Sequence, residues 1–174
     1  MKTRGFVPGL LLAALVLAAM SLPGCTHLTA GSLKSSIVIN APVEEVFAWV
    51  ANPENHGKRL PDQKITDVHG SGLGAGYHFY VKAKYGVFQG DQVVVGYIPN
   101  QLWVEEVALG LNGTGVYTWI FLAQGDQTQI VKVANSDFEM PFLARLLSKK
   151  KITDMAQTEQ DKELQRVKAE VEKK

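Results

Sequence analysis

Apolar side chains near residue 45 recur every three or four positions, which predicts a helix with one apolar face. The positions concerned are Val43, Val46, Phe47 and Val50. Pro42 suits the first turn of such a helix, because an N–H at that position has no intrahelical partner. The Asn-Pro dipeptide that follows residue 51 ends the helix. The sequence therefore predicts a short amphipathic helix, followed by a brief irregular or helical link.

From Lys64 onward the helical spacing gives way to alternation of apolar and polar residues, which is typical of strands with one buried face. Turn residues such as Asn112-Gly113 and Gly125-Asp126 divide the alternating region. One further strand precedes the helix. The expected strands are 36–39, 63–69, 76–85, 87–98, 101–109, 114–124 and 128–136.

A second, longer helix is expected over 141–172, beginning at Pro141. Phe142 and Leu146 belong to its apolar stripe. The order strand, helix pair, six strands and long helix predicts an α+β fold. We expect a curved antiparallel sheet of about seven strands wrapped on the C-terminal helix, with a cavity between them.

The segment IVINAPVEEVFAWVANPENHGKRLP at 37–61 resembles the SRPBCC or START-like superfamily of polyketide cyclases/dehydrases and lipid-transport proteins. The shared pattern is a strand, Asn-Ala-Pro, an acidic helix start, an aromatic residue, and Asn-Pro before Leu-Pro. Gly-Asp-Gln-Thr at 125–128 also fits. The resemblance covers about 36–172 and implies the helix-grip (START-like) fold. It specifies the fold well and the activity poorly.

The N-terminus has the pattern of a bacterial lipoprotein signal peptide. Lys2 and Arg4 precede an apolar run of 11 residues, which is shorter than the roughly 20 needed to span a membrane. The following Leu-Pro-Gly-Cys resembles a lipobox, with cleavage before Cys25. We therefore expect a signal peptide at 1–24, a lipidated tether at 25–34 and one START-like domain at 35–174.

Cys25 is the sole cysteine, so the chain forms no internal disulfide, and lipid on this thiol would anchor the protein to a membrane. Thr26 at the next position favours the outer membrane, on its periplasmic face, over the inner membrane. The chain has 18 basic and 17 acidic residues; without Lys2 and Arg4 it has 16 and 17. Near-neutrality without a basic stripe argues against nucleic acid as a partner.

The sequence carries no motif for a metal, a cofactor or a nucleophile. Gly70-Ser71-Gly72-Leu73-Gly74-Ala75 matches a dinucleotide-binding pattern on paper, but a strand follows it where that site requires a helix. We interpret it as a turn between strands. The four histidines lack paired metal-ligand spacing and are interpreted as surface or rim residues.

Two neighbouring strands supply candidate ligand-cavity residues. Trp103, Glu105 and Val107 share one strand face, and Tyr117, Trp119 and Phe121 share another. Phe142 and Leu146 of the long helix would face them. An interior Glu105 is costly to bury unless paired or protonated and could anchor a ligand; alternatively it points to solvent or pairs with a lysine of a neighbouring strand. The aromatic residues could equally be core.

The leading hypothesis from these features is a membrane-anchored lipoprotein that binds a lipid-like or other apolar small molecule in the cavity between sheet and C-terminal helix. One alternative is a cyclase/dehydratase-like enzyme, with Glu105 or Tyr117 as its acid/base. Another is a non-catalytic accessory protein of the cell envelope, whose surface and not its cavity matters.

Overall fold

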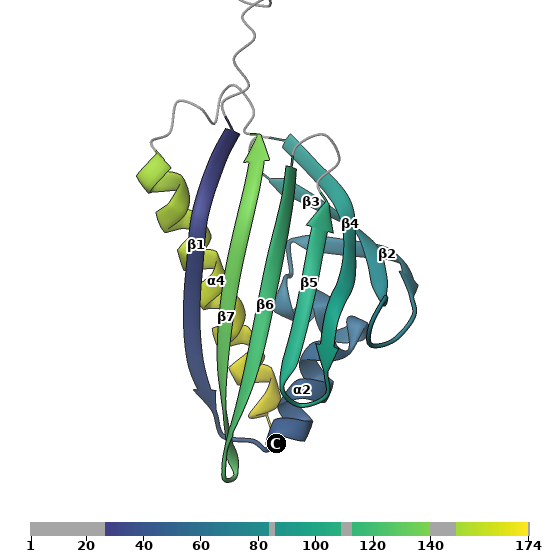
Figure 1. The fold of residues 1–174 in the computed structure, drawn as a ribbon, viewed down its shortest axis with the longest axis vertical. Helices are drawn as coiled ribbons and strands as arrows, with labels where there is room; N and C mark the ends of the chain where they lie inside the picture. The colour runs from purple at the N-terminus through teal and green to yellow at the C-terminus, as the bar shows by residue number, and fades with distance from the viewer. Residues whose placement is uncertain (1–26, 84–85, 109–112, 140–148, 174) are drawn as a thin grey trace, which may run out of the picture.

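The computed structural model describes residues 27–83, 86–108, 113–139 and 149–173. Seven strands form one sheet in the order β1-β7-β6-β5-β4-β3-β2, and every neighbouring pair is antiparallel (Figure 1). The strands are β1 (His27–Ile39), β2 (Gln63–His69), β3 (Gly76–Ala83), β4 (Gly86–Ile98), β5 (Leu102–Ala108), β6 (Gly113–Gln124) and β7 (Gln127–Glu139). The predicted meander, and with it the predicted fold class, is confirmed.

Strand β1 begins earlier than the sequence predicts. It pairs with β7 from His27↔Glu139 to Ile39↔Thr128, with an irregularity between Thr29 and Gly31. Most of the predicted tether at 25–34 is therefore part of the sheet, because its small and polar residues find backbone partners along the edge of β7. Cys25 and the predicted signal peptide lie outside the described residues.

The first helix is α2 (Val43–Ala51), which buries the four predicted residues Val43, Val46, Phe47 and Val50. The Asn52 side chain then accepts from the Glu54 N–H and starts the short 3-10 helix η1 (Pro53–Asn55). Helix α3 (His56–Arg59) follows immediately. The link after α2 is therefore helical, and it returns the chain toward the sheet.

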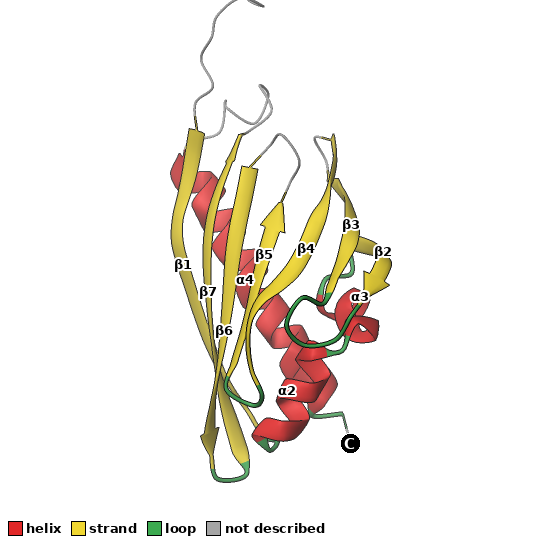
Figure 2. Ribbon diagram, turned by 45° about the vertical axis from the view of Figure 1, so that its right-hand side comes forward, coloured by secondary structure: helices red, strands yellow, loops and turns green. Residues whose placement is uncertain are grey.

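The long helix α4 (Lys149–Val171) lies across the same side of the sheet as α2 and α3 (Figures 1 and 2). Its buried residues include Ile152, Leu164 and Val167. Polar contacts also attach it to the first strand: Ser35 Oγ donates to Asp161 Oδ1 at 2.5 Å. The predicted start at residue 141, with Phe142 and Leu146, lies outside the described residues.

The main core lies between α2, the C-terminal part of α4 and the facing parts of β1, β4, β5, β6 and β7. Trp119, Ile39 and Ile130 have essentially no exposed side chain, and Val46 and Leu164 close the core from the helices. Each fully buried aliphatic side chain of this kind contributes about 1.5–3 kcal/mol to the stability of the fold. None of the described helices is both long enough and apolar enough to cross a membrane.

Candidate functional site: a cavity beneath the first helices

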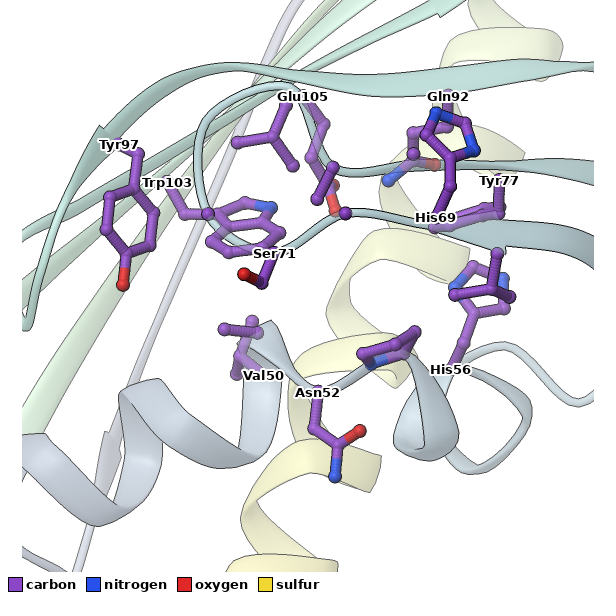
Figure 3. Close-up of a pocket in the computed structure, with 18 of the residues that line it drawn as sticks. Val50, Asn52, His56, His69, Ser71, Tyr77, Gln92, Tyr97, Trp103 and Glu105 are labelled. Atoms are coloured by element: carbon purple, nitrogen blue, oxygen red, sulfur yellow. The ribbon is translucent and has the colours of Figure 1, made fainter.

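A cavity of about 230 Å³ lies between the segment α2–η1–α3, the turn that joins β2 to β3, and the inner face of β3, β4 and β5. In Figure 3, Tyr77, Gln92, Trp103 and Glu105 project from the strands, while Val50 and His56 point toward them from the helices. Its lining residues are Ala48, Val50, Ala51, Asn52, Pro53, His56, Arg59, Val68, His69, Gly70, Ser71, Gly72, Ala75, Gly76, Tyr77, Gln92, Val94, Tyr97, Trp103 and Glu105.

The position of this cavity differs from the prediction of a space between sheet and C-terminal helix. No described residue of α4 lines it. The reason is that α4 packs mainly along β1, whereas the segment from α2 to α3 lies opposite β3, β4 and β5 and encloses the cavity against them. The helical link, for which the sequence predicted no role, forms one wall of the cavity.

The glycine-rich turn at 70–75 forms another wall. Gly70, Gly72 and Gly74 have φ values of 70°, 65° and 81°, a left-handed region that glycine enters without steric cost. Two backbone hydrogen bonds hold the turn against β4, from Gly74 N to Val94 O and from Val94 N to Ala75 O, both at 2.8 Å. The interpretation of this segment as a turn between strands is correct.

The structure divides the described members of the predicted cavity into three groups. Trp103 and Glu105 line the cavity. Val107 is buried in a small cluster with Tyr77 and Phe79, with Tyr117 packed beside it. Trp119 and Phe121, 0% and 3% exposed, belong to the main core. Phe142 and Leu146 lie outside the described residues.

Glu105 is an interior carboxylate, 4% exposed. Arg59 Nη2 donates to its Oε1 at 3.4 Å, and Trp119 Nε1 donates to its Oε2 at 3.2 Å. Burial alone would raise the pKa of Glu105, but the cations of Arg59 and Lys132 outweigh burial and hold this pKa below its usual value. Glu105 is therefore an ionised, paired carboxylate, and its direct ion-pair partner is a helix arginine.

Four buried charges extend from Glu105 to the long helix. Arg59 Nε lies 3.3 Å from Glu163 Oε1, and Lys132 Nζ contacts Glu163 Oε2. The two cations also lie over the Trp119 ring, with Arg59 Cζ at 5.0 Å and Lys132 Nζ at 4.2 Å from its centroid. We call Arg59, Glu105, Lys132 and Glu163 the charge cluster; its formal charges cancel.

His56 is 2% exposed, so its interpretation as a surface or rim residue is wrong. Arg59 Nη2 donates to its Nδ1 at 3.4 Å, which places the ring proton on Nε2, 2.9 Å from Gln63 Oε1. Burial and the neighbouring Arg59 lower the pKa of His56 to about 4. The helical link turns this ring inward, where its edge meets Tyr77 at 4.7 Å between centroids.

Sequence reasoning missed three members of the charge cluster. A signal existed for two of them: Lys132 alternates with the interior residues Ile130 and Ala134, and Glu163 directly precedes an apolar position of the long helix. Arg59 had none, because its inward direction depends on the four-residue helix α3. Among the described residues, no group of three or more His, Cys, Asp or Glu side chains is placed to hold a metal ion.

The sequence profile of the family described as polyketide cyclase / dehydrase and lipid transport matches residues 30–172. No curated protein matches the chain. The match spans all the described helices and, apart from the first three residues of β1, all the strands.

Solved structures share the fold at low sequence identity. Protein TTHA0849 from Thermus thermophilus superposes with a TM-score of 0.67 at 17% identity, covering 81% of this chain and 97% of that one. Protein CV1439 from Chromobacterium violaceum gives 0.65 at 15%, covering 82% and 99%. Zhui aromatase/cyclase from Streptomyces sp. R1128 gives 0.61 at 14%, covering 82% and 93%.

Proposed function

Because the chain belongs to the polyketide cyclase/dehydrase and lipid transport family, we propose that it binds an apolar small molecule in the cavity beneath α2 and α3 without transforming it. The observation that carries the proposal is the cavity itself, a concave space whose walls combine aliphatic and aromatic side chains with polar groups. Its volume of about 230 Å³ suits a compact ligand, of one or two rings, better than a long acyl chain.

The walls explain why the ligand would be apolar. Val50 and Val94 come from α2 and β4, and Tyr97 packs edge-on against Trp103 with 5.8 Å between ring centroids. Every 100 Å² of apolar ligand surface that such walls cover is worth about 2.5 kcal/mol before the costs of association. Zhui aromatase/cyclase has the same fold, which is compatible with a compact cyclic ligand.

Binding is favoured over catalysis by the state of the two proposed acid/base residues. The lowered pKa of Glu105 keeps it ionised, so it is a poor proton donor, and its ion pair makes it a weak base. Burial, with Glu163 and Glu105 nearby, raises the pKa of Tyr117 to about 12. Tyr117 is also absent from the cavity lining. Neither residue is tuned toward neutral pH.

We further propose that lipid on Cys25 anchors this binding domain to the periplasmic face of the bacterial outer membrane. The lipobox-like Leu-Pro-Gly-Cys supports this, and β1 begins at His27, only two residues after the cysteine. The anchored domain would then sit against the bilayer, from which an apolar ligand can partition.

The test is binding of 2-ethylnaphthalene, an apolar bicyclic compound, to the full chain in lipid nanodiscs, measured by equilibrium dialysis. Ala75→Trp places an indole in the cavity and is expected to reduce binding at least tenfold. Ala123→Trp, at an exposed position of β6, is the matched control and corrects for partition into lipid. Equal binding by the two variants would contradict the proposal.

A further inference from the structure

The outer face of the sheet carries apolar side chains although no described element covers it. All the described helices lie on the other side of the sheet (Figures 1 and 2). On the outer face, Ile98, Val93 and Val116 are 48%, 38% and 37% exposed. An antiparallel sheet with one face in water usually turns polar residues to that face. The composition of this outer face therefore indicates that something covers it.

The apolar residues form two adjacent rows that cross β5, β6 and β7, with the residue of β6 in the middle of each row. The strand register makes the first row Leu102, Ile120 and Val131, and the second row Val104, Thr118 and Val133. Neighbouring strands lie about 4.8 Å apart, and successive residues on one face about 7 Å apart. The two rows therefore form one continuous surface.

A third row, next to the second, contains the one charged group of the three rows. Here Val116 of β6 lies between Glu106 of β5 and Asn135 of β7. The side chains of Glu106 and Asn135 are exposed, and among the described residues neither has a hydrogen-bond or ion-pair partner. We call the three rows, which all centre on β6, the outer patch.

The outer patch is complementary to itself about the line of β6. When two copies pack face to face around a two-fold axis along β6, each β5 residue lies over the β7 residue of the same row in the other copy. Leu102 then meets Val131, and the second row likewise brings valine to valine. In the third row the carboxylate of Glu106 meets the side-chain amide of Asn135, which can donate to it.

This pairing does not require the strands of the two sheets to be parallel. Stacked sheets usually cross at about 30°. Side chains one strand away from the axis, at about 4.8 Å, move by only about 2.5 Å under such a rotation. Each residue therefore stays within side-chain reach of the same partner.

The size of the surface suits a dimer. With the flanking residues of β1 and β4, the outer patch extends over five strands and over residues 116–122 of β6. At about 4.8 Å per strand and 3.4 Å per residue, this is about 600 Å² on each copy. Two such faces bury about 1,200 Å², the lower end of the range for specific interfaces. We therefore expect a reversible dimer of moderate affinity.

The chemistry of the outer patch favours a second copy over a lipid surface. Surfaces that lie in the membrane interface carry Lys or Arg beside Trp or Phe. The three rows contain none of these residues, and their one charge is the carboxylate of Glu106. A two-fold axis along β6 also keeps the first residues of both β1 strands at one end of the dimer, where the two proposed lipid anchors can reach one membrane.

We propose that two copies of the chain form a dimer through the outer patch, with the two-fold axis along β6 and Glu106 of each copy accepting a hydrogen bond from Asn135 of the other. The dimer is a sandwich of two sheets with the helices on its two outer sides. This inference is independent of the proposed function, because no residue of the outer patch lines the cavity.

The test is sedimentation equilibrium of the full chain in a density-matched non-ionic detergent, over about 1 to 100 μM, which brackets the affinity of interfaces of this size. Thr118→Lys places two ammonium groups against each other on the axis and should raise the dimer dissociation constant at least about a hundredfold. Thr158→Lys, the same change at an exposed position of α4, is the matched control and should leave the dissociation constant unchanged.

A reciprocal change identifies the contact. Asn135→Asp sets a carboxylate against Glu106 at two symmetry-related places and should weaken the dimer about tenfold. Adding Glu106→Gln should restore the dissociation constant to within about threefold, because the glutamine amide can donate to the new carboxylate. A merely structural effect of Asn135→Asp would persist in the double variant. Both positions are exposed, so the urea midpoints of these variants should stay close to that of the unchanged chain.

Three results would overturn the proposal. The first is a monomer at every concentration, and binding of that monomer to phosphatidylglycerol vesicles would then assign the outer face to lipid. The second is a dimer that Thr118→Lys leaves intact, because such a dimer uses another surface. The third is a dimer that Asn135→Asp weakens and Glu106→Gln does not restore, because the two side chains then do not meet across the axis.

Discussion

At the scale of the residue, His56 and Glu105 are both buried beside Arg59, and their charge states are opposite. Glu105 keeps its charge because Arg59 lies beside it, whereas His56 loses its charge because the same cation adds to the effect of burial. Arg59 itself is strongly favoured in its charged form, since the two carboxylates outweigh burial and raise its pKa. Arg59 therefore keeps Glu105 charged, and it adds to the burial that keeps His56 neutral.

His56 predicts a loss of stability in mild acid. Its pKa is about 4 in the folded protein and 6.5 in the unfolded chain, so between these values the unfolded state binds a proton that the folded state does not. Stability therefore falls as pH falls, by about 2 kcal/mol between pH 7 and pH 5. Urea denaturation at steps of half a pH unit measures the slope.

His56→Gln should remove most of that slope, since glutamine does not titrate. His69→Gln, at an exposed histidine at the end of β2, serves as the control and should keep the slope of the unchanged chain. A slope that survives in His56→Gln would show that His56 is not buried in its neutral form.

At the scale of the element, two short connections build the cavity wall, and they use glycine for different reasons. Gly74 lies in the β2–β3 turn with φ of 81° and open space around its Cα. Gly57 lies in α3, also with open space, but without a positive φ. Only the backbone conformation distinguishes the two positions, which makes them a matched pair.

We therefore expect opposite effects of one substitution. Gly74→Ala should destabilise the protein by about 1 kcal/mol, because a left-handed backbone is costly for a residue with a Cβ. Gly57→Ala should be neutral or stabilising by up to about 1 kcal/mol, because alanine is the better helix former. Differences in the urea midpoint at constant m-value measure both. A destabilising Gly57→Ala would contradict this account of α3.

At the scale of the whole molecule, the charge cluster ties the layers together. Arg59 comes from α3, Glu105 from β5, Lys132 from β7 and Glu163 from α4. The side chains that close the cavity toward the sheet are thus held by the long helix as well, although no described residue of α4 lines the cavity. This connection explains how α4 supports the site without touching its ligand space.

The membrane anchor is the prediction that belongs to the whole chain. Cys25→Ala should move the protein from the membrane fraction to the soluble fraction of cells, because the thioether to lipid can no longer form. Thr26→Ala keeps the cysteine and should leave the protein with the membrane. Mass spectrometry of the N-terminal peptide checks the acyl chains directly. An unmodified Cys25 in that peptide would contradict the anchor.

The local pattern predicted most elements, for identifiable reasons. The spacing of Val43, Val46, Phe47 and Val50 predicted α2, and alternation placed Trp103 and Glu105 on one inner face of β5. The early start of β1 escaped prediction because small polar residues carry no periodic signal, and its strand state depends on pairing with β7.

The sequence by itself determined the order of helix and strands and the sheet face that turns inward, because the periods of 3.6 and 2 are properties of the local backbone. Only the tertiary structure decided where the cavity lies and which residues meet in it. His56 and Arg59 are brought to Glu105 across 49 and 46 positions of the chain by the turn from α2 into α3. Such contacts leave no periodic trace, because each is fixed by the packing of elements and not by the spacing of residues.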